Sequence, residues 1–337
     1  PRKPEDEGLL YGFEPCASIQ LEVSLAASSL AELIIVDGWA SNMGLATAAV
    51  SKYLAKDAIS PETLNHALSR QRNLIMPPAP KDYRYQFAGD GRSLSVEIGT
   101  PRPYAHVIAN SLGQGAVMTN DGDIFSFHGN SRLNSFSPFR MGDGRSAPAG
   151  QMFYVYDLAK GIAYSPSFTP LRRHDSVYDV TFSPGMACYR SNKDELEIEL
   201  SIFVAPNAPI EFKLLKIRNN SSIPRLLQIV PAIEIILAET PSESLGAITS
   251  RVEDDLKAIY FQNPSNKFVN GWAFVATSLS AEHAETSRRR FLGHENRTSH
   301  IPYMVEHGHP DACAPEQQRK IAAFCGAIDA QPGQDYH

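Results

Sequence analysis

Residues 129–139, GNSRLNSFSPF, concentrate side chains that could bind a ligand covered in hydroxyl groups. The segment holds two amides, three hydroxyls and one guanidinium beside two phenylalanines. Planar amides and guanidinium groups hydrogen-bond to paired hydroxyls, and aromatic faces pack against the C–H patches of a sugar ring. The segment is therefore either a polar turn or one edge of a sugar site, whose expected contacts are Asn130, Ser131, Arg132, Asn134 and Phe139.

Two other segments carry polar and aromatic residues. Residues 100–110, TPRPYAHVIAN, add Tyr104 and Asn110 to the expected sugar contacts, because prolines give this segment a rigid frame. The same segment also has the apolar residues of a strand that enters the core. Residues 288–297, RRRFLGHENR, form either a basic and aromatic loop near the sugar or a solvated turn.

No group of residues predicts catalysis. Glycoside chemistry normally needs two carboxylates, but those of residues 195–199 alternate with apolar residues, as on the solvated face of a strand. The sequence has no G-x-S-x-G segment, and its ten histidines single out no Ser-His-Asp set. We therefore expect no catalytic residue in this chain.

One cluster, EHGHPDAC, could be drawn as a metal site with His307, His309, Asp311 and Cys313. Its histidines lie two residues apart, and no helical pair supports that spacing, so we predict no metal ligand. Two GDGR segments lack the strand–loop–helix context of a phosphate site and are expected to be turns. We expect no cofactor.

The composition excludes several classes of protein. With 337 residues, 43% hydrophobic and 20% charged, the chain is globular, and a net charge of -6 argues against nucleic acid as a partner. Its four scattered cysteines predict free thiols in a reducing compartment. The N-terminal PRKPEDEGLL lacks the apolar region of a signal peptide, and no apolar run approaches the roughly 20 residues that span a bilayer. We expect a soluble chain, cytoplasmic or held at the cytoplasmic face of a membrane through a larger parent protein.

Strand patterns dominate the sequence. Apolar and polar residues alternate over 195–204, as in a strand with one solvated face. The strand expected at 226–237 contains Pro231, which predicts a bulge or an edge strand. Ala- and Leu-rich residues 42–55 predict a helix, and a second helix is expected to begin after Ser60 and end before the Pro-rich residues 76–83. The other expected strands are 18–36 (two strands), 94–98, 210–218, 226–237 and 272–279.

Several segments, in this order, resemble one known family. They are TPRPYAHVIAN, GNSRLNSFSPF, GQMFYVYDLAKGIAYSPSFTPL, ELSIFVAPNAPIEFKLLKIRNNSSIPRLLQIVPAIEIIL and RRRFLGHEN. Over roughly residues 84–315 the chain resembles the N-terminal super-sandwich of the cellobiose phosphorylase family, glycoside hydrolase family ninety-four. The greatest similarity is to the phosphorylase-like region of cyclic beta-1,2-glucan synthases.

The resemblance implies a galactose mutarotase-like β super-sandwich of two large antiparallel sheets. In the family an (α/α) barrel follows and carries the catalytic Asp and the phosphate site. The sandwich packs on the barrel, helps to close the sugar site and contributes to dimerisation. Asn130, Ser131 and Arg132 match the family's Asn-Ser-Arg, Leu133 stands where the family usually has Glu, and Phe139 and Tyr104 replace tryptophans.

The resemblance also suggests a division of the chain, which begins without Met and is expected to be a fragment of a longer protein. The expected units are closing strands of a preceding sandwich-like unit (1–40), a helical connector and Pro-rich linker (41–83), the super-sandwich (84–317) and an irregular tail (318–337). The tail is expected because the alternation of apolar and polar residues is lost after Gln317.

We therefore expect a non-catalytic domain that binds or supports carbohydrate within a glucan-processing phosphorylase or cyclic glucan synthase-like protein. Its expected partners are a glucan oligosaccharide, the barrel of the parent protein and a second copy of the chain. The alternatives are an independent carbohydrate-binding module and a purely structural or dimerisation scaffold.

Overall fold

The computed structural model describes residues 22–26, 30–53, 84–100, 103–138, 150–293, 301–314 and 319–337. Strands make up about half of these residues, and neighbouring strands are antiparallel except for the pairs β1–β19 and β2–β20. The expected class, a mainly β sandwich with a short helix near the N-terminus, is confirmed.

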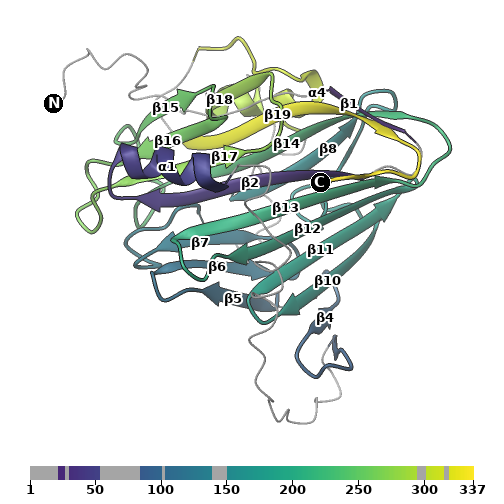
Figure 1. The fold of residues 1–337 in the computed structure, drawn as a ribbon, viewed down its shortest axis with the longest axis horizontal. Helices are drawn as coiled ribbons and strands as arrows, with labels where there is room; N and C mark the ends of the chain where they lie inside the picture. The colour runs from purple at the N-terminus through teal and green to yellow at the C-terminus, as the bar shows by residue number, and fades with distance from the viewer. Residues whose placement is uncertain are drawn as a thin grey trace.

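Two large sheets form the layers of the sandwich (Figure 1). Among the described residues, the larger sheet has the order β15 (Thr249–Glu253), β16 (Ala258–Gln262), β17 (Trp272–Thr277), β2 (Leu30–Ala40), β20 (Asp335–Tyr336), β13 (Ile210–Asn219), β12 (Leu196–Val204), β11 (Met186–Lys193), β10 (Val177–Ser183), β4 (Leu94–Val96) and β3 (Tyr85–Phe87). The smaller has the order β18 (His283–Ser287), β19 (Lys320–Gln331), β1 (Glu22–Ala26), β14 (Arg225–Ile235), β8 (Gln151–Asp157) and β9 (Ile162–Tyr164).

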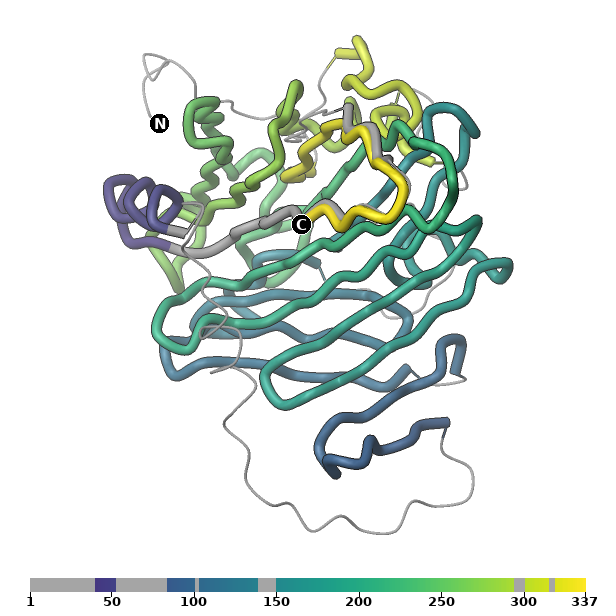
Figure 2. The backbone as a smooth tube through the Cα atoms, turned by 45° about the vertical axis from the view of Figure 1, so that its right-hand side comes forward, coloured from purple at the N-terminus to yellow at the C-terminus, as the bar shows by residue number. Residues whose placement is uncertain are grey.

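A third sheet of β5 (Ala105–Ala109), β6 (Gln114–Thr119) and β7 (Ile124–His128) lies against β12 and β13. Figures 1 and 2 show these three strands beside the larger sheet. One face of this third sheet contributes Ile108, Ala116, Met118 and Ile124 to the core. It therefore covers a part of the larger sheet that the smaller sheet leaves open.

The main core lies between the layers, and alternation in the strands explains it. In β12, Leu196, Ile198, Leu200 and Ile202 are buried in this core, while Glu197 and Glu199 face outward, as the sequence predicts. Strand β14 faces the core with Leu227, Ile229, Ile233 and Ile235. Burying apolar side chains from both layers is the dominant favourable contribution to the stability of such a fold.

Helices cover part of the outer face of each large sheet. Helix α1 (Met43–Tyr53), expected at 42–55, starts after Asn42, whose Oδ1 accepts a hydrogen bond from the Leu45 N–H at 3.0 Å. Its Ala46 and Val50 pack with residues of β13, β16 and β17. Helices α3 (Arg288–Leu292) and α4 (Tyr303–His307) lie on the smaller sheet.

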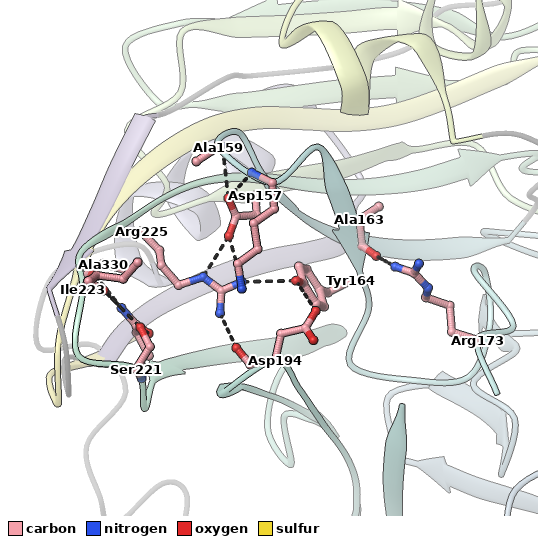
Figure 3. A network of polar contacts seen from close by, with 12 residues as sticks. Asp157, Ala159, Ala163, Tyr164, Arg173, Asp194, Ser221, Ile223, Arg225 and Ala330 are labelled. Carbon is pink, nitrogen blue, oxygen red and sulfur yellow. Dashed lines mark hydrogen bonds and ion pairs between the residues drawn. The ribbon is translucent and has the colours of Figure 1, made fainter. Parts of the chain in front are cut away.

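A buried polar network joins the two large sheets at one end (Figure 3). Arg225 donates from Nε to Asp157 Oδ2 at 2.8 Å and from Nη1 to the Asp194 carbonyl at 2.9 Å. Tyr164 donates to Asp194 Oδ2 at 2.7 Å, and burial raises the pKa of this tyrosine. Asp157, Tyr164 and Arg225 belong to the smaller sheet and Asp194 to the turn between β11 and β12, so the network fixes the spacing of the layers.

The expected irregular tail at 318–337 is wrong, because these residues include the long strand β19. This strand lies between neighbours on both sides and is buried on both faces, by the main core and by α3 and α4. A strand buried on both faces needs no polar alternation. Its sequence, KIAAFCGAIDAQ, therefore lacks the pattern on which the prediction depended.

The strands expected to close a preceding unit also belong to these sheets. Strand β1 pairs with β14 and β19, and β2 pairs with β13 and β17. The expected second helix, the Pro-rich linker and Cys16 lie outside the described residues. Within the described residues, the cysteines are free thiols at positions Cys188, Cys313 and Cys325.

Pro231 corrects a further expectation, since β14 is neither bulged there nor an edge strand. The register with β19 is the same before and after Pro231, from Ile229 opposite Gly326 to Ala232 opposite Ala323. Pairing with β19 lapses only over Val230 and Pro231, where the proline has no N–H to donate. On the other side Pro231 stays paired with Phe153 of β8.

Candidate functional site

The segment 129–136 forms a tight loop directly after β7. Gly129 has a φ of 74° and donates its N–H to the Gly113 carbonyl at 2.8 Å. Asn130 Oδ1 accepts hydrogen bonds from the N–H groups of Arg132 and Leu133, both at 2.9 Å. Both glycine and asparagine thus act in the turn, and Asn130 uses its side-chain oxygen to shape the backbone that presents Arg132.

Asn134 anchors the loop from below. It is 1% exposed, donates from Nδ2 to the His128 carbonyl at 3.0 Å and accepts at Oδ1 from Asn266 Nδ2 at 3.0 Å. Ser135 donates from Oγ to the Ser131 carbonyl at 2.9 Å. Because Asn134 is buried and fully bonded, its role in this structure is to hold the loop, whereas Ser131 keeps an exposed side chain.

Arg132 is the most prominent side chain of the loop, 78% exposed. It donates from Nε to Glu239 Oε1, and this bond and the charge of Glu239 raise the pKa of the guanidinium. Glu239 follows β14 and is brought close because Ser135 donates its N–H to the Ala238 carbonyl at 3.2 Å. A carboxylate from a distant segment therefore pairs with Arg132.

An exposed aromatic side chain, Phe268, completes this surface. It is 46% exposed and lies over Gly129, where an added Cβ would be 3.2 Å from its ring. Asn266 fixes it, because Oδ1 accepts from the Phe268 N–H at 2.8 Å while Nδ2 donates to the Leu237 carbonyl at 2.9 Å. We call Asn130, Ser131, Arg132, Leu133, Glu239 and Phe268 the loop surface.

The sequence analysis missed Glu239 and Phe268. An Asx turn at Asn266, two residues before an aromatic residue, is a signal that could have drawn attention to Phe268. Nothing local shows that the three segments 130–134, 237–239 and 266–268 meet, because their contacts are made only in the folded chain.

The other expected contacts do not join the loop surface. Asn110 donates from Nδ2 to the carbonyls of Ala205 and Ala208, at 2.7 and 2.6 Å, and accepts at Oδ1 from two N–H groups of its own turn. Tyr104 lies at the opposite end of β5, half-buried, with its ring edge-on to Tyr85 at 5.7 Å. Phe139 lies outside the described residues.

Buried charges stiffen the strand that carries the loop. Ser126 of β7 donates to Glu211 Oε2 and accepts from Gln151 Nε2 at 2.5 Å. Glu211 pairs with Lys213 at 3.1 Å, and neither side chain is exposed. Buried charges are costly unless they are paired and hydrogen-bonded. The bonds of Ser126 to Glu211 and Gln151 therefore hold β7 to β13 and β8 in one arrangement.

The carboxylate of the loop surface, Glu239, and the nearby Glu243 do not form an acid and base pair. Glu239 bonds to Arg132, and the neighbouring Glu243 accepts at Oε2 from the N–H groups of Glu239 and Thr240, at 3.2 and 3.4 Å. Each is committed to a structural bond, so the geometry supports binding of hydroxyl groups and gives no support for cleavage.

The cluster EHGHPDAC, for which the sequence predicts no metal ligand, makes other contacts. His307 stacks on Tyr303 with ring centroids 3.9 Å apart, and His309 meets the same ring edge-on. Asp311 Oδ1 accepts from the Cys313 N–H at 3.3 Å. In the described ranges, no group of three or more His, Cys, Asp or Glu residues is arranged to hold a metal ion.

A shallow hollow of about 280 Å³ lies elsewhere, on the outer face of the larger sheet. Its lining is charged or amide-bearing and contains no aromatic residue (Glu197, Glu199, Lys216, Arg218 and Asn220). Arg190 and Asp335 form ion pairs with several of these residues. Because its charges are paired across strands and it lacks an aromatic face, this hollow suits a sugar less well than the loop surface.

The outward face of the third sheet is apolar. Val107 is 60% exposed, and it shares this face with Phe127, whose ring lies where a Cβ on Gly115 would be. Besides the buried Thr119, which lies opposite Ala105, the pairing of the strands places on this face Ala105, Val107, Ala109, Gly115, Val117, Phe125 and Phe127. We call these residues the apolar face. Solvated sheet faces normally carry polar side chains, so this one is a candidate contact for another polypeptide.

Comparison with known proteins gives one family and one relative. A family model described as glycosyl hydrolase 94, supersandwich domain, matches residues 93–337. A 3-O-beta-D-glucopyranosyl-beta-D-glucuronide phosphorylase of Paenibacillus borealis is 22% identical over 187 residues, which is 54% of this chain and 24% of that protein. The chain thus spans about a quarter of the length of this relative. None of the helices in the described residues has the length and apolarity needed to cross a membrane.

Proposed function

The chain belongs to the glycosyl hydrolase 94 supersandwich family, and on this premise we propose that it is a non-catalytic sandwich that supports glucan processing. The parent would be a phosphorylase or a cyclic beta-1,2-glucan synthase-like protein, in the cytoplasm or at the cytoplasmic face of a membrane. In this proposal the loop surface contacts a glucan, and a catalytic domain outside this chain performs the reaction.

One observation carries the proposal: Arg132, which pairs with Glu239, belongs to a loop whose first residue, Gly129, lies under the exposed ring of Phe268. An exposed guanidinium and a carboxylate provide a donor and an acceptor for hydroxyl groups, and an aromatic ring provides an apolar face. Asn130, Asn134 and Asn266 bond to the backbone of the segments that carry these residues, so little backbone entropy is lost when a ligand binds.

The apolar face offers a contact for the catalytic domain that this proposal requires. It is separate from the charged outer face of the larger sheet. Its three strands form a layer that can pack against another protein. We assign it to contact with the catalytic barrel of the parent protein. A scaffold that pairs with a second copy through the same face is the second candidate function.

Calorimetric titration of the chain with a beta-1,2-linked gluco-oligosaccharide tests the proposed function. We expect weak binding that is lost in Arg132→Ala and in Phe268→Ala and kept in Phe268→Tyr. Arg218→Ala, a change to a half-exposed arginine on the outer face of the larger sheet, is the matched control and should bind as the unmodified chain does. Equal binding by Arg132→Ala would remove the loop surface from the proposal, and cleavage of the glucan by the chain alone would contradict a non-catalytic role.

A further inference from the structure

The Arg132–Glu239 pair leaves hydrogen-bonding groups on both partners available. Within the described residues, the guanidinium bonds through Nε to Glu239 Oε1, so its Nη1 and Nη2 groups face solvent. Glu239, with a side chain 31% exposed, keeps Oε2 as an acceptor. The pair therefore offers donors and an acceptor side by side, which matches two neighbouring hydroxyls, since each hydroxyl both donates and accepts.

A second carboxylate makes the surroundings of Arg132 more negative. Glu243 is held in place by accepting the N–H groups of Glu239 and Thr240. The hydrogen bond to Glu239 and the charge of Glu239 contribute most to the raised pKa of Arg132, and the charge of Glu243 raises it further. The one guanidinium thus faces two carboxylates, and its positive charge is already neutralised before a ligand arrives.

From this charge arrangement we propose that Glu239 determines specificity, so that the loop surface takes neutral vicinal diols and rejects sugars that carry a carboxylate. The inference rests on the proposed function and names the class of sugar at the same surface. An unpaired arginine would bind a uronate carboxylate through two parallel hydrogen bonds. Here Glu239 occupies only Nε of the guanidinium, but its negative charge repels a second carboxylate, so specificity follows from this repulsion as well as from attraction.

A neutral diol needs no displacement of Glu239. Its hydroxyls donate to Glu239 Oε2 and accept from the Arg132 terminal nitrogens, while Phe268 packs against the C–H face of the ring. A carboxylate at the same place can reach only the Arg132 terminal nitrogens, and there its negative charge lies beside the like charge of Glu239. The two classes of sugar therefore differ in charge at the position where the surface is least tolerant of negative charge.

Titration of the full 337-residue chain with methyl beta-glucoside and methyl beta-glucuronide tests the proposal, with backbone amide shifts as the readout. These ligands share a ring and differ in charge at C6. We expect the glucuronide to bind at least about tenfold more weakly, because opposed like charges at an interface are costly. Glu239→Gln keeps an oxygen for Arg132 Nε and removes the charge, so it should strengthen glucuronide binding about tenfold.

The double variant Arg132→Ala/Glu239→Gln is expected to lose this gain, and Glu243→Gln to show a smaller gain. Spectra of each variant outside the loop surface report whether it is folded. An unchanged ratio of the two affinities in Glu239→Gln would overturn the specificity role, as would equal binding of both ligands by the unmodified chain.

A separate result of the same titration tests the proposed function. It fails if the neutral glucoside shifts no amide of the loop surface in the unmodified chain. In that case, glucuronide binding gained by Glu239→Gln and lost in the double variant still upholds the charge assignment. Absence of that gain overturns the charge assignment as well.

Discussion

Asn110 illustrates, at the scale of the residue, how a polar side chain that suits a sugar can be fully used by the fold. Its amide reaches the carbonyls of Ala205 and Ala208 across the turn that precedes β13, and its oxygen accepts from Leu112 and Gln114. The side chain joins the turn between β5 and β6 to the larger sheet. Its residue type alone did not distinguish this role from sugar binding.

Asn110→Ala is therefore expected to lower the free energy of unfolding by about 1–3 kcal/mol, because it leaves backbone groups without partners. Sugar affinity should not change. Urea denaturation followed by circular dichroism measures the free energy of unfolding. The control is Asn220→Ala. Asn220 is exposed, and in the described residues its side chain makes one hydrogen bond, which it accepts from Arg218 Nε. If Asn110→Ala lost sugar binding at unchanged stability, Asn110 would be a sugar contact after all.

Glu285 connects stability to pH. Burial raises its pKa to about 7, and Arg290, whose Nη1 lies 2.8 Å from Glu285 Oε2, acts in the opposite direction. A carboxyl whose pKa is raised on folding binds more protons in the folded state between its two pKa values. The folded state should therefore gain stability from Glu285 as the pH falls from about 7 towards 4.5, and lose it as the pH rises through 7.

The comparison with Glu285→Gln isolates this effect. The free energy of unfolding of the unmodified chain, minus that of the variant, is expected to increase as the pH falls across this interval. Urea denaturation at several pH values measures the difference, since titrations common to both proteins cancel. A difference that is constant with pH would contradict the raised pKa.

Strand β19 shows, at the scale of the element, what the sequence can and cannot predict. Strands with one solvated face, such as β12 with Glu197 and Glu199 outward, are recognisable because their polarity alternates. Strand β19 is buried on both faces, so alternation is absent and its residues resembled an irregular tail. The physical cause is tertiary, because α3 and α4 cover a face that would otherwise be solvated.

The same limit applies to the loop surface. Asn130 and Arg132 were predicted from their types and spacing, and the structure presents Arg132 at the tip of a fixed loop. Glu239 lies 107 residues further along the chain, so its contact with Arg132 depends on the pairing of Ser135 with Ala238. Spacing within a segment cannot reveal such a partner.

Ala323→Pro tests the place of β19 in the smaller sheet. Ala323 pairs with Ala232 of β14 and Glu285 of β18, and a proline there removes an N–H from an interior strand. We expect a loss of about 3 kcal/mol or more in the free energy of unfolding, or failure to fold. Asp255→Pro, at an exposed position in the turn between β15 and β16, is the control and should be better tolerated. Equal tolerance of both changes, measured by thermal denaturation, would mean that β19 is not an interior strand.

At the scale of the whole molecule, the outer surfaces differ in character. Ion pairs connect β11, β12, β13 and β20 on the outer face of the larger sheet, as expected where a sheet meets water. The apolar face of β5, β6 and β7 has no such charges, which is why we assign it to another polypeptide. The alternative scaffold function would use this face to join two copies.

Without that partner, the apolar face should make the chain self-associate as its concentration rises. Val107→Asp places a charge on the face and should reduce this association several-fold in sedimentation velocity experiments. Val177→Asp is a matched control, because Val177 is 65% exposed on β10, outside the apolar face. If both variants, or neither, reduce self-association, the apolar face is not the contact.

The central claim is that a glucan binds the loop surface through Arg132, Glu239 and Phe268, and mapping of backbone amide shifts during a glucan titration tests it most directly. The account predicts that the largest shifts fall on residues 129–135, 239–243 and 266–269, and that Arg132→Ala abolishes them. Shifts centred on the outer face of the larger sheet, or unchanged in Arg132→Ala, would contradict it.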